Sequence, residues 1–541
     1  MSLLSVDNLT IALPPGSDRN YAISGVSFTL DPGEVLCIVG ESGSGKSVTA
    51  ATIMGLLPRT LVCEGGRILF AGRDLLALSN DAMRALRGSQ LGMIFQEPMT
   101  ALNPLMRVGD QIAEVLTVHG VGGTRERVPE LLSAVNLPDI ARLARAYPHM
   151  LSGGQRQRVM IAMALALEPA LLIADEPTTA LDVTTQMQIL RLIKHIQQRR
   201  GTGVLFITHD FGVVAEIADR VAVMQEGCVV EAGTAAHVLN APQHPYTRSL
   251  IAAVPNRIAG RIQLIGRQVL EVVGVRKTYW RGGGIFGGGT PVQAVESADF
   301  VLHEGETLGL VGESGSGKST LARCVVRLVQ PDVGAIRFHD TDLTRLDRRG
   351  WRPFRQRIQM IFQDPFASLN PRRRVGEIIA DGPIAHGTPR AEALRRVQEL
   401  LGLVQLDPGA AERFPHEFSG GQRQRIGIAR ALAVNPELLI ADEPVSALDV
   451  SVQAQVLELL ETLRRRLALT MLFITHDLRV AAQICGRIAV MQRGRIVELG
   501  ETAQVFAAPQ HPYTRSLLDS IPGKGWTPVR CEEIGKNLGH V

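Results

Sequence analysis

The chain has 541 residues, a length that allows about three or four domains of ordinary size. Its 57 lysines and arginines nearly balance 53 aspartates and glutamates, and this small net charge argues against a dedicated nucleic-acid binder. With 45% hydrophobic and 20% charged residues, the composition also excludes a disordered or fibrous chain.

Membrane and secretion signals are weak in this sequence. No apolar run approaches the roughly 18 residues that a bilayer span requires. The first residues lack a basic segment followed by a long apolar stretch, so we expect no secretory signal. The six cysteines are scattered without a C-x-x-C pair, which is typical of a reducing cytosol and predicts no zinc site.

The sequence consists of two collinear copies of one domain. Copies of SGGQRQR begin at Ser152 and Ser419, 267 residues apart, a period far too long for a solenoid. GESGSGKS, IADEP, ITHD and PQHPYTRSL also occur twice, in the same order. We therefore predict a first domain over 1–255, a linker over 256–268, a second domain over 269–522 and a tail over 523–541. The tract Gly282–Gly289 is predicted to be a flexible hairpin loop, with a binding loop as the less favoured alternative.

Short apolar runs ending in polar residues indicate buried strands. Three such runs occur in each copy: Val35–Val39, Leu171–Ala174 and Val204–Thr208, then Thr307–Val311, Leu438–Ala441 and Met471–Thr475. Continuously apolar strands favour a parallel sheet covered by helices on both faces. Each copy is therefore predicted to be an α/β domain whose polar residues gather at the strand ends, where ligands bind in such sheets.

A phosphate-binding loop follows the first of these strands in each copy. The pattern G-x-x-x-x-G-K-S lets successive backbone N–H groups surround phosphate oxygens at the start of a helix. Two occurrences, each after a predicted strand, exclude a chance match. The lysines are predicted to reach the β- and γ-phosphates of ATP, and the following serines to hold Mg²⁺. The predicted nucleotide-binding residues are Gly40, Glu41, Ser42, Gly43, Ser44, Gly45, Lys46, Ser47 and Val48, with Gly312, Glu313, Ser314, Gly315, Ser316, Gly317, Lys318, Ser319 and Thr320.

Acidic and histidine residues end the next two strands of each copy. Asp175 and Asp442 stand where a carboxylate supports the Mg²⁺ shell. Glu176 and Glu443 come directly after them and are predicted to activate the attacking water, the alternative being a surface acid after a strand. A lone histidine is more often structural, but a histidine at the same strand end in both copies favours a γ-phosphate sensor. These histidines are His209 and His476.

These motifs resemble those of ATP-binding-cassette ATPases over nearly the whole chain. SGGQRQR is similar to the signature of that family, and Gln96 and Gln363 match its Q-loops, so the resemblance implies that both glutamines are catalytic and bind the metal. Ala180-Leu181-Asp182 and Ala447-Leu448-Asp449 match its D-loops. The fold that the resemblance implies is two tandem P-loop NTPase domains, each with a parallel-sheet core and a helical subdomain.

The resemblance also implies that each signature faces the P-loop of the other copy. Ser152, Gly153, Gly154 and Gln155 are then expected to cap ATP held by Lys318. Ser419, Gly420, Gly421 and Gln422 are expected to cap ATP held by Lys46. Both serines are good N-caps for the helices that follow, which supply helix-dipole and N–H donors to the opposite site.

A narrower resemblance concerns the Q-loop segments and the HPYTRSL elements. Gln96–Pro104, Gln363–Pro371 and HPYTRSL after each copy are similar to dipeptide/oligopeptide/nickel importer ATPases. The first copy resembles the D-type and the second the F-type subunit, so the whole resembles a fused ATPase of the Yej-type peptide and glutathione importers. The alternative for HPYTRSL alone is a plain helix start.

Two departures from the family pattern bear on the sites. Tyr279 falls where the family stacks an aromatic ring on adenine, whereas the first copy has Leu13 there. Tyr21 in a nearby loop is the alternative aromatic, and we expect weaker ATP binding at the first site. Some relatives carry a cysteine cluster in the C-terminal tail for an iron–sulfur centre. Here the tail contains only Cys531, so no cluster is expected.

The function predicted from these resemblances is an ATPase subunit that energises a peptide-type importer at the cytoplasmic face of the bacterial inner membrane. The implied partners are two permease subunits, which dock near Met99–Ile112 and Phe366–Ile378, and an extracytoplasmic binding protein; no nucleic acid is expected. The rivals are a soluble cassette protein of translation or DNA repair and a module that binds ATP without turnover. The transported solute is left open.

Overall fold

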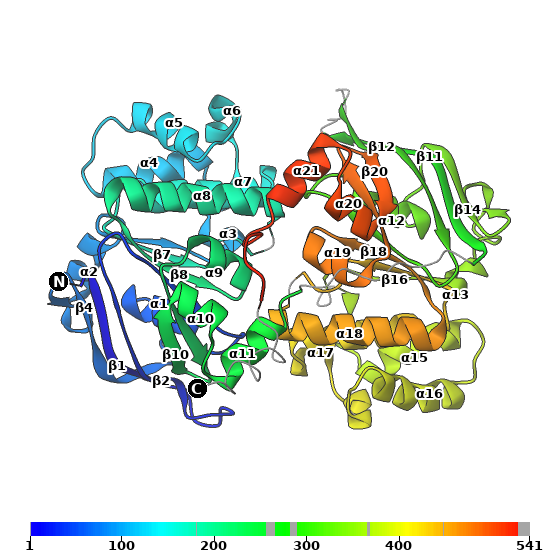
Figure 1. The fold of residues 1–541 in the computed structure, drawn as a ribbon, viewed down its shortest axis with the longest axis horizontal. Coiled ribbons are helices and arrows are strands. Elements are labelled where there is room, and N and C mark those ends of the chain that lie inside the picture. Colours follow the sequence, from blue (N-terminus) through cyan, green and yellow to red (C-terminus); the bar gives the residue numbers. More distant parts are fainter. Residues whose placement is uncertain are drawn as a thin grey trace, which may run out of the picture.

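The computed structural model describes residues 2–179, 181–255, 266–281, 289–364, 368–446 and 448–528. Most of the predicted linker, most of the glycine-rich tract, Phe366 and the tail from residue 529, which includes Cys531, lie outside the described residues. The two halves form two lobes that lie side by side. The long helices α8 (Val183–Arg200) and α18 (Val450–Leu467) each run across their own lobe, with one end at the boundary to the other lobe (Figure 1).

The first half combines one mainly parallel sheet with a separate antiparallel sheet. In the described residues the strand orders are β10-β9-β3-β8-β7-β6 and β2-β1-β4-β5. The strands are β1 Leu4–Ala12, β2 Tyr21–Leu30, β3 Val35–Val39, β4 Val62–Phe70, β5 Arg73–Asp74, β6 Leu91–Ile94, β7 Leu171–Asp175, β8 Gly203–Thr208, β9 Arg220–Gln225 and β10 Cys228–Thr234. The other helices are α1 Lys46–Ile53, α2 Asn80–Leu86, α3 Pro98–Ala101, α4 Val108–Val118, α5 Thr124–Ala134, α6 Ile140–Arg145, α7 Gly153–Ala164, α9 Phe211–Ile217, α10 Ala235–Asn240 and α11 Pro245–Ala252.

The second half repeats this arrangement. One parallel bridge, between Ser297 and Arg495, joins its two sheets into the order β15-β14-β11-β12-β20-β19-β13-β18-β17-β16. The strands are β11 Gln268–Arg281, β12 Thr290–His303, β13 Thr307–Val311, β14 Val333–Phe338, β15 Thr341–Asp342, β16 Ile358–Ile361, β17 Leu438–Asp442, β18 Thr470–Thr475, β19 Arg487–Gln492 and β20 Arg495–Glu501. The other helices are α12 Lys318–Val325, α13 Phe354–Arg357, α15 Val375–Ala385, α16 Arg390–Leu403, α17 Gly420–Leu432, α19 Leu478–Ile484, α20 Thr502–Ala507 and α21 Pro512–Asp519.

The six strands predicted from apolar runs are confirmed, and each is buried along its length. Alternate residues of β3 enter two different cores. Val35, Cys37 and Val39 pack with the helices on one face, whereas Leu36 and Ile38 pack with α1 and the antiparallel sheet. Both faces are therefore covered, which explains why these strands are apolar at nearly every position before their polar ends.

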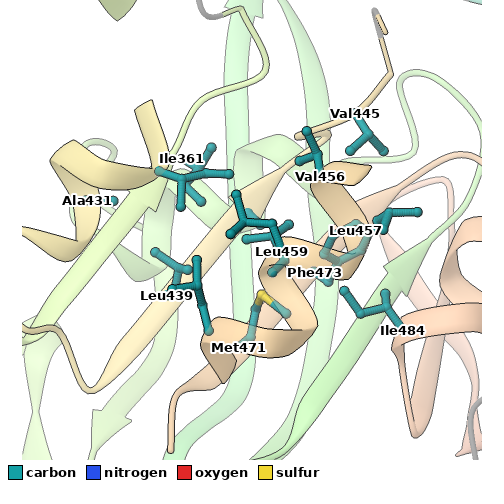
Figure 2. Packing of buried hydrophobic residues seen from close by; sticks show 14 of the residues in the cluster. Ile361, Ala431, Leu439, Val445, Val456, Leu457, Leu459, Met471, Phe473 and Ile484 are labelled. Carbon is teal, nitrogen blue, oxygen red and sulfur yellow. The ribbon is translucent and has the colours of Figure 1, made fainter. Parts of the chain in front are cut away.

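The second half builds its larger core in the same way. Ile361, Leu439, Met471 and Phe473 project from the parallel strands onto residues of α18 such as Leu459 (Figure 2). This packing aligns the carboxyl ends of β13, β17 and β18, so the polar residues that follow each strand meet at one edge of the sheet.

A helical region stands apart from the sheets in each half. It contains α4, α5 and α6 in the first half, at the top of one lobe, and α15 and α16 in the second half, at the bottom of the other lobe (Figure 1). The signature helices α7 and α17 connect these regions to the sheets. Among the described residues, no helix has both the length and the apolar character needed to cross a bilayer.

Candidate ATP sites between the two halves

The P-loop of each half turns from a buried strand into a helix through glycines that accept no side chain. A Cβ atom on Gly40 or Gly312 would lie 2.2 Å from the carbonyl oxygen of Met224 or Met491. Gly45, at the N-cap of α1, has a φ of 100°. Only glycine combines such positive φ values with so close an approach of the backbone, so the loops hold their N–H groups in a compact ring.

The P-loop lysines lie at the base of these rings and are at most 5% exposed. The Lys46 ammonium donates to the carbonyl oxygens of Gly40 and Glu41, both at 2.7 Å, and Lys318 does the same to Gly312 and Glu313 at 2.8 Å. Burial lowers the pKa of both lysines, although nearby carboxylates act in the opposite direction. The cations are thus positioned where a triphosphate enters the loop.

The predicted metal-binding serine and aspartate of each half meet. Ser47 donates to Asp175 at 3.0 Å, and Ser319 donates to Asp442 at 2.9 Å. Burial raises the pKa of Asp175 to about 6, and it also raises the pKa of Asp442. A buried carboxylate beside a hydroxyl is an oxygen donor set of the kind that Mg²⁺ prefers, so these residues fit the ion.

Glu176 and Glu443 follow the strand ends in strained backbone. Their φ values are 45° and 47°, in the left-handed region that most side chains avoid. Each residue nevertheless keeps a backbone hydrogen bond, to Ile207 or Ile474, at 3.0 Å. This turn brings each carboxylate to the glutamine of the Q-loop and the histidine at the next strand end, a feature that composition and spacing do not reveal.

The other predicted catalytic residues gather on these carboxylates. In the first half His209 lies 3.2 Å from Glu176 and the Gln96 amide donates to it at 3.2 Å. In the second half His476 lies 3.2 Å from Glu443, and Gln363 donates to it at 2.9 Å. In both halves, the amide group of the Q-loop glutamine thus donates a hydrogen bond to the carboxylate of the glutamate.

The glutamates stay ionised in this setting. Burial by itself would raise the pKa of Glu176, but contacts with His209, Thr179 and Lys46 lower it to about 2. The pKa of Glu443 is lowered in the same way, mainly by His476. Although burial opposes it, contact with the carboxylate raises the pKa of each histidine. A carboxylate that is already ionised can accept a proton from water.

The first signature lies across a cavity from the P-loop of the other half. The cavity, of about 740 Å³, is lined by Ser152–Gln155 and Asp182 on one side and by Glu313, Ser314 and Gly315 on the other. Ser152 and Gln155 form a capping box at the start of α7. The helix N-terminus therefore faces the opposite phosphate-binding loop, as the trans arrangement requires.

The second signature has the same local structure. Ser419 and Gln422 form a capping box at the start of α17. The Asp449 carboxylate, at the start of the neighbouring helix α18, accepts a hydrogen bond of 3.1 Å from the Ser42 amide of the first P-loop. The residues that follow the D-loops also cross between the halves, because Val183 packs in the core of the second half and Val450 against that of the first.

The residues at the predicted adenine positions differ as the alignment indicates. Tyr279 lies on β11 and is 41% exposed, whereas Leu13 follows β1 and packs against a core cluster of the first half. Tyr21 is the first residue of β2 rather than part of a loop, and it pairs with Ala12 on the adjacent strand. Tyr279 therefore has an accessible ring, and Tyr21 is the exposed aromatic next to Leu13.

Sequence reasoning missed one contact at the centre of the interface. Arg479 of α19 forms an ion pair of 2.9 Å with Asp210 in the other half, and the two side chains are 18% and 21% exposed. The equivalent of Arg479 in the first half is Gly212, where a Cβ atom would lie 2.3 Å from the Arg479 guanidinium. The sequence does show this difference, since THDFG in the first half corresponds to THDLR in the second. The difference can be interpreted only when the relative position of the two halves is known.

Two P-loops that each contact residues of the other half are typical of the nucleotide-binding part of an ABC transporter. The family model for ABC transporters matches residues 23–179 and 295–446, and the model for the C-terminal region of oligopeptide/dipeptide transporters matches 230–272 and 497–537. The chain belongs to the ABC transporter family, as an ATPase with both cassettes in one polypeptide.

Among its relatives are proteins named glutathione import ATP-binding protein GsiA. Those of Escherichia coli K12 and Shigella flexneri are 48% identical over 558 aligned residues, which cover 96% of this chain and 90% of theirs. A solved dimer of the ATP-binding cassette MJ0796 with ADP and phosphate is 29% identical, with a TM-score of 0.39, and the match covers 43% of this chain and 98% of that chain.

Proposed function

We propose that this protein is the ATPase subunit of an importer for glutathione or other small peptides, bound to the cytoplasmic face of the membrane. The observation that carries the proposal is the cavity in which Ser152–Gln155 face Glu313–Gly315, because it is a composite site that one cassette alone lacks. The names of the relatives and the two C-terminal regions typical of oligopeptide/dipeptide transporters support the solute class.

The residues divide the work of hydrolysis. The P-loop amides and Lys46 or Lys318 bind the β- and γ-phosphates, and the signature of the opposite cassette contacts the γ-phosphate. Glu176 or Glu443 accepts a proton from the attacking water. As this happens, the water oxygen bonds to the γ-phosphorus, while the bond between the γ-phosphorus and the β–γ bridging oxygen breaks. ADP and phosphate are the products, and His209 or His476 holds the carboxylate and senses the γ-phosphate.

Each site has a serine and an aspartate that would hold Mg²⁺: Ser47 with Asp175, and Ser319 with Asp442. Gln96 and Gln363 contact the proposed base and are close enough to respond to the ion as well. When bound, the ion neutralises charge on the phosphate oxygens. Tyr279 is proposed to stack on adenine in the second cassette.

Surfaces suited to permeases lie beside both Q-loops. In the first cassette the large apolar side chains Phe95, Met99 and Leu105 are 39%, 54% and 85% exposed. In the second cassette a groove of about 600 Å³ is lined by residues that include Phe362, Asn370 and Ile378. Exposed apolar side chains next to a catalytic glutamine are typical of a protein contact, and we propose that two permease subunits dock here and that an extracytoplasmic binding protein delivers the solute.

The test is to co-express the chain with permease subunits and a binding protein of the peptide-importer class and to measure uptake of labelled glutathione and dipeptides into cells. We expect uptake that depends on the ATPase chain and is absent with the Glu176→Gln/Glu443→Gln variant. Phosphate release by the purified chain is measured in parallel. Hydrolysis without any membrane association or uptake would overturn the importer assignment in favour of the soluble alternative.

A further inference from the structure

The HPYTRSL elements are built identically at the end of each cassette. His244 caps α11 by accepting the Tyr246 amide at 3.3 Å, and Glu231 accepts the amides of His244 and Gln243 at 3.0 and 2.7 Å. Arg248 donates to the Pro242 carbonyl at 3.0 Å. These four hydrogen bonds hold the start of the helix in place.

The second cassette repeats this set of contacts. His511 accepts the Tyr513 amide at 3.2 Å, Glu498 accepts the amides of His511 and Gln510 at 3.0 and 2.8 Å, and Arg515 donates to the Pro509 carbonyl at 3.0 Å. In both elements the tyrosine hydroxyl is the group that extends from this rigid helix start to another part of the cassette.

Each tyrosine hydroxyl reaches the P-loop of its own cassette. The Tyr246 hydroxyl accepts the Glu41 amide at 3.2 Å and lies 3.3 Å from the Glu41 carboxylate. The Tyr513 hydroxyl accepts the Glu313 amide at 3.2 Å. Burial raises the pKa of both phenols to about 12, so both remain neutral at physiological pH. The same contact in both cassettes argues against an accident of packing.

The P-loop glutamates extend this contact to the opposite cassette. The Glu41 carboxylate accepts the hydroxyl of Ser451, and Glu313 accepts the hydroxyl of Thr184 at 2.6 Å. Ser451 and Thr184 occupy equivalent positions in the first turn of α18 and α8, two residues after the D-loop aspartates. Each P-loop glutamate therefore joins the helix that ends its own cassette to the D-loop helix of the other.

We propose that Tyr246 and Tyr513 are positioning residues for ATP binding and hydrolysis, which act by holding the P-loop glutamate against the D-loop hydroxyl of the opposite cassette. The inference rests on the proposed function, since it assigns a role within the same sites. Neither tyrosine needs to touch the nucleotide. Removing a hydroxyl loosens the loop that binds phosphate and, through the glutamate, the contact between cassettes.

The experiment uses the full chain with Tyr246→Phe, Tyr513→Phe and both together. A neutral hydrogen bond is worth a modest free energy, so we expect each variant to raise the KM for ATP about threefold to tenfold, with a smaller change in kcat. Ser249→Ala is the matched control. Ser249 donates to the Tyr246 carbonyl at 2.8 Å within the same helix, so its loss should leave the KM unchanged.

Double-mutant cycles separate positioning from simple packing. Tyr246→Phe and Ser451→Ala act on one carboxylate, so their effects on KM should be non-additive, whereas Tyr246→Phe and Thr184→Val belong to different networks and should be additive. The proposal would be overturned if the tyrosine variants had the KM of the wild type. It would also be overturned if they had a lower melting temperature and the effects on KM were additive in both cycles.

Binding measurements keep this inference separate from the proposed function. ATP titrated calorimetrically into the Glu176→Gln/Glu443→Gln chain reports affinity without turnover, and adding Tyr246→Phe should weaken it by the same factor as KM. If the wild-type chain hydrolyses ATP and the tyrosine variants bind ATP with unchanged affinity, only this inference is wrong. A wild-type chain that binds ATP without hydrolysing it would sink the proposed function.

Discussion

The two cassettes agree at the reacting groups and differ at the centre of their interface. The serine–aspartate distances are 3.0 and 2.9 Å, and each histidine lies 3.2 Å from its glutamate. At the interface centre, however, Gly212 of the first cassette meets Arg479 of the second. The contacts of the proposed catalytic groups are thus present in both cassettes, whereas the described residues contain the arginine–aspartate pair of Arg479 between the cassettes once.

The difference follows from the geometry of a pseudo-twofold interface. A residue near such an axis meets its own counterpart, so two arginines would bring like charges into the space that one occupies. A single arginine opposite a glycine fills that space and pairs with Asp210. Fusing both cassettes in one chain allows them to differ here while the sites stay equivalent in their main contacts.

The largest expected effect tests the equivalence of the two sites. Glu176→Gln/Glu443→Gln should lower the rate of phosphate release at least about 100-fold, because the general base is lost, while ATP binding is kept. The two single variants compare the sites directly, since equal losses would show equal turnover. Glu271→Gln, which affects a surface pair with Arg337, is the control and should hydrolyse ATP normally. Unchanged hydrolysis in the double variant would remove the base assignment.

The second prediction breaks the central contact. Arg479→Ala leaves Asp210 without its ion-pair partner in a largely buried position and should lower the free energy of unfolding by about 2–4 kcal/mol. Arg337→Ala removes an exposed ion pair of 2.8 Å and should cost less than about 1 kcal/mol. Both values are measured by denaturant unfolding at pH 7. Equal losses would show that the interface pair has no special weight.

The ion pair between Arg479 and Asp210 should make the stability of the protein depend on pH. Burial would raise the pKa of Asp210, but Arg479 lowers it below its usual value. The pair therefore stabilises the fold fully above about pH 4, the unfolded value, and this stabilisation is lost as the pH falls through the lower folded value. The difference in stability between wild type and Arg479→Ala should shrink from pH 7 toward pH 3. A difference that is constant over this range would contradict the ion-pair explanation.

The third prediction concerns nucleotide affinity. Tyr279→Leu makes the second site like the first and should weaken its ATP binding by about 1–3 kcal/mol, the value of one stacking contact. It is measured with Lys46→Ala, so that the second site is observed alone. Tyr279→Phe keeps the ring and should bind normally. If Lys46→Ala and Lys318→Ala chains show equal affinities, the expected difference between Leu13 and Tyr279 is absent.

The smallest expected effect concerns the C-terminal segment of the second cassette, which crosses to the first. The Gly523 amide lies 3.4 Å from Glu216 on α9, and the partly buried Trp526 packs against the first cassette's core. Trp526→Ala should therefore lower the free energy of unfolding by about 1–2 kcal/mol through lost apolar contact. Trp280→Ala, where the side chain is 71% exposed, should change little. Equal effects would show that the crossing segment adds no stability.

The sequence alone determined the two-domain organisation, the parallel strands and the residues of each P-loop. These depend on local backbone requirements and on short-range patterns, such as glycines where no Cβ fits and apolar runs buried on both faces. Spacing also placed Asp175, Glu176 and His209 at strand ends, because parallel strands end at one edge.

Only the tertiary structure decided which residues of the two halves meet. The pairing of Arg479 with Asp210, the contact of Ser451 with Glu41 and the crossing of Trp526 all join residues at least 200 positions apart. Such contacts depend on the relative placement of whole domains, and no local pattern encodes that placement. The left-handed turn at Glu176 is likewise a product of the surrounding fold, which holds a strained residue that its own side chain disfavours.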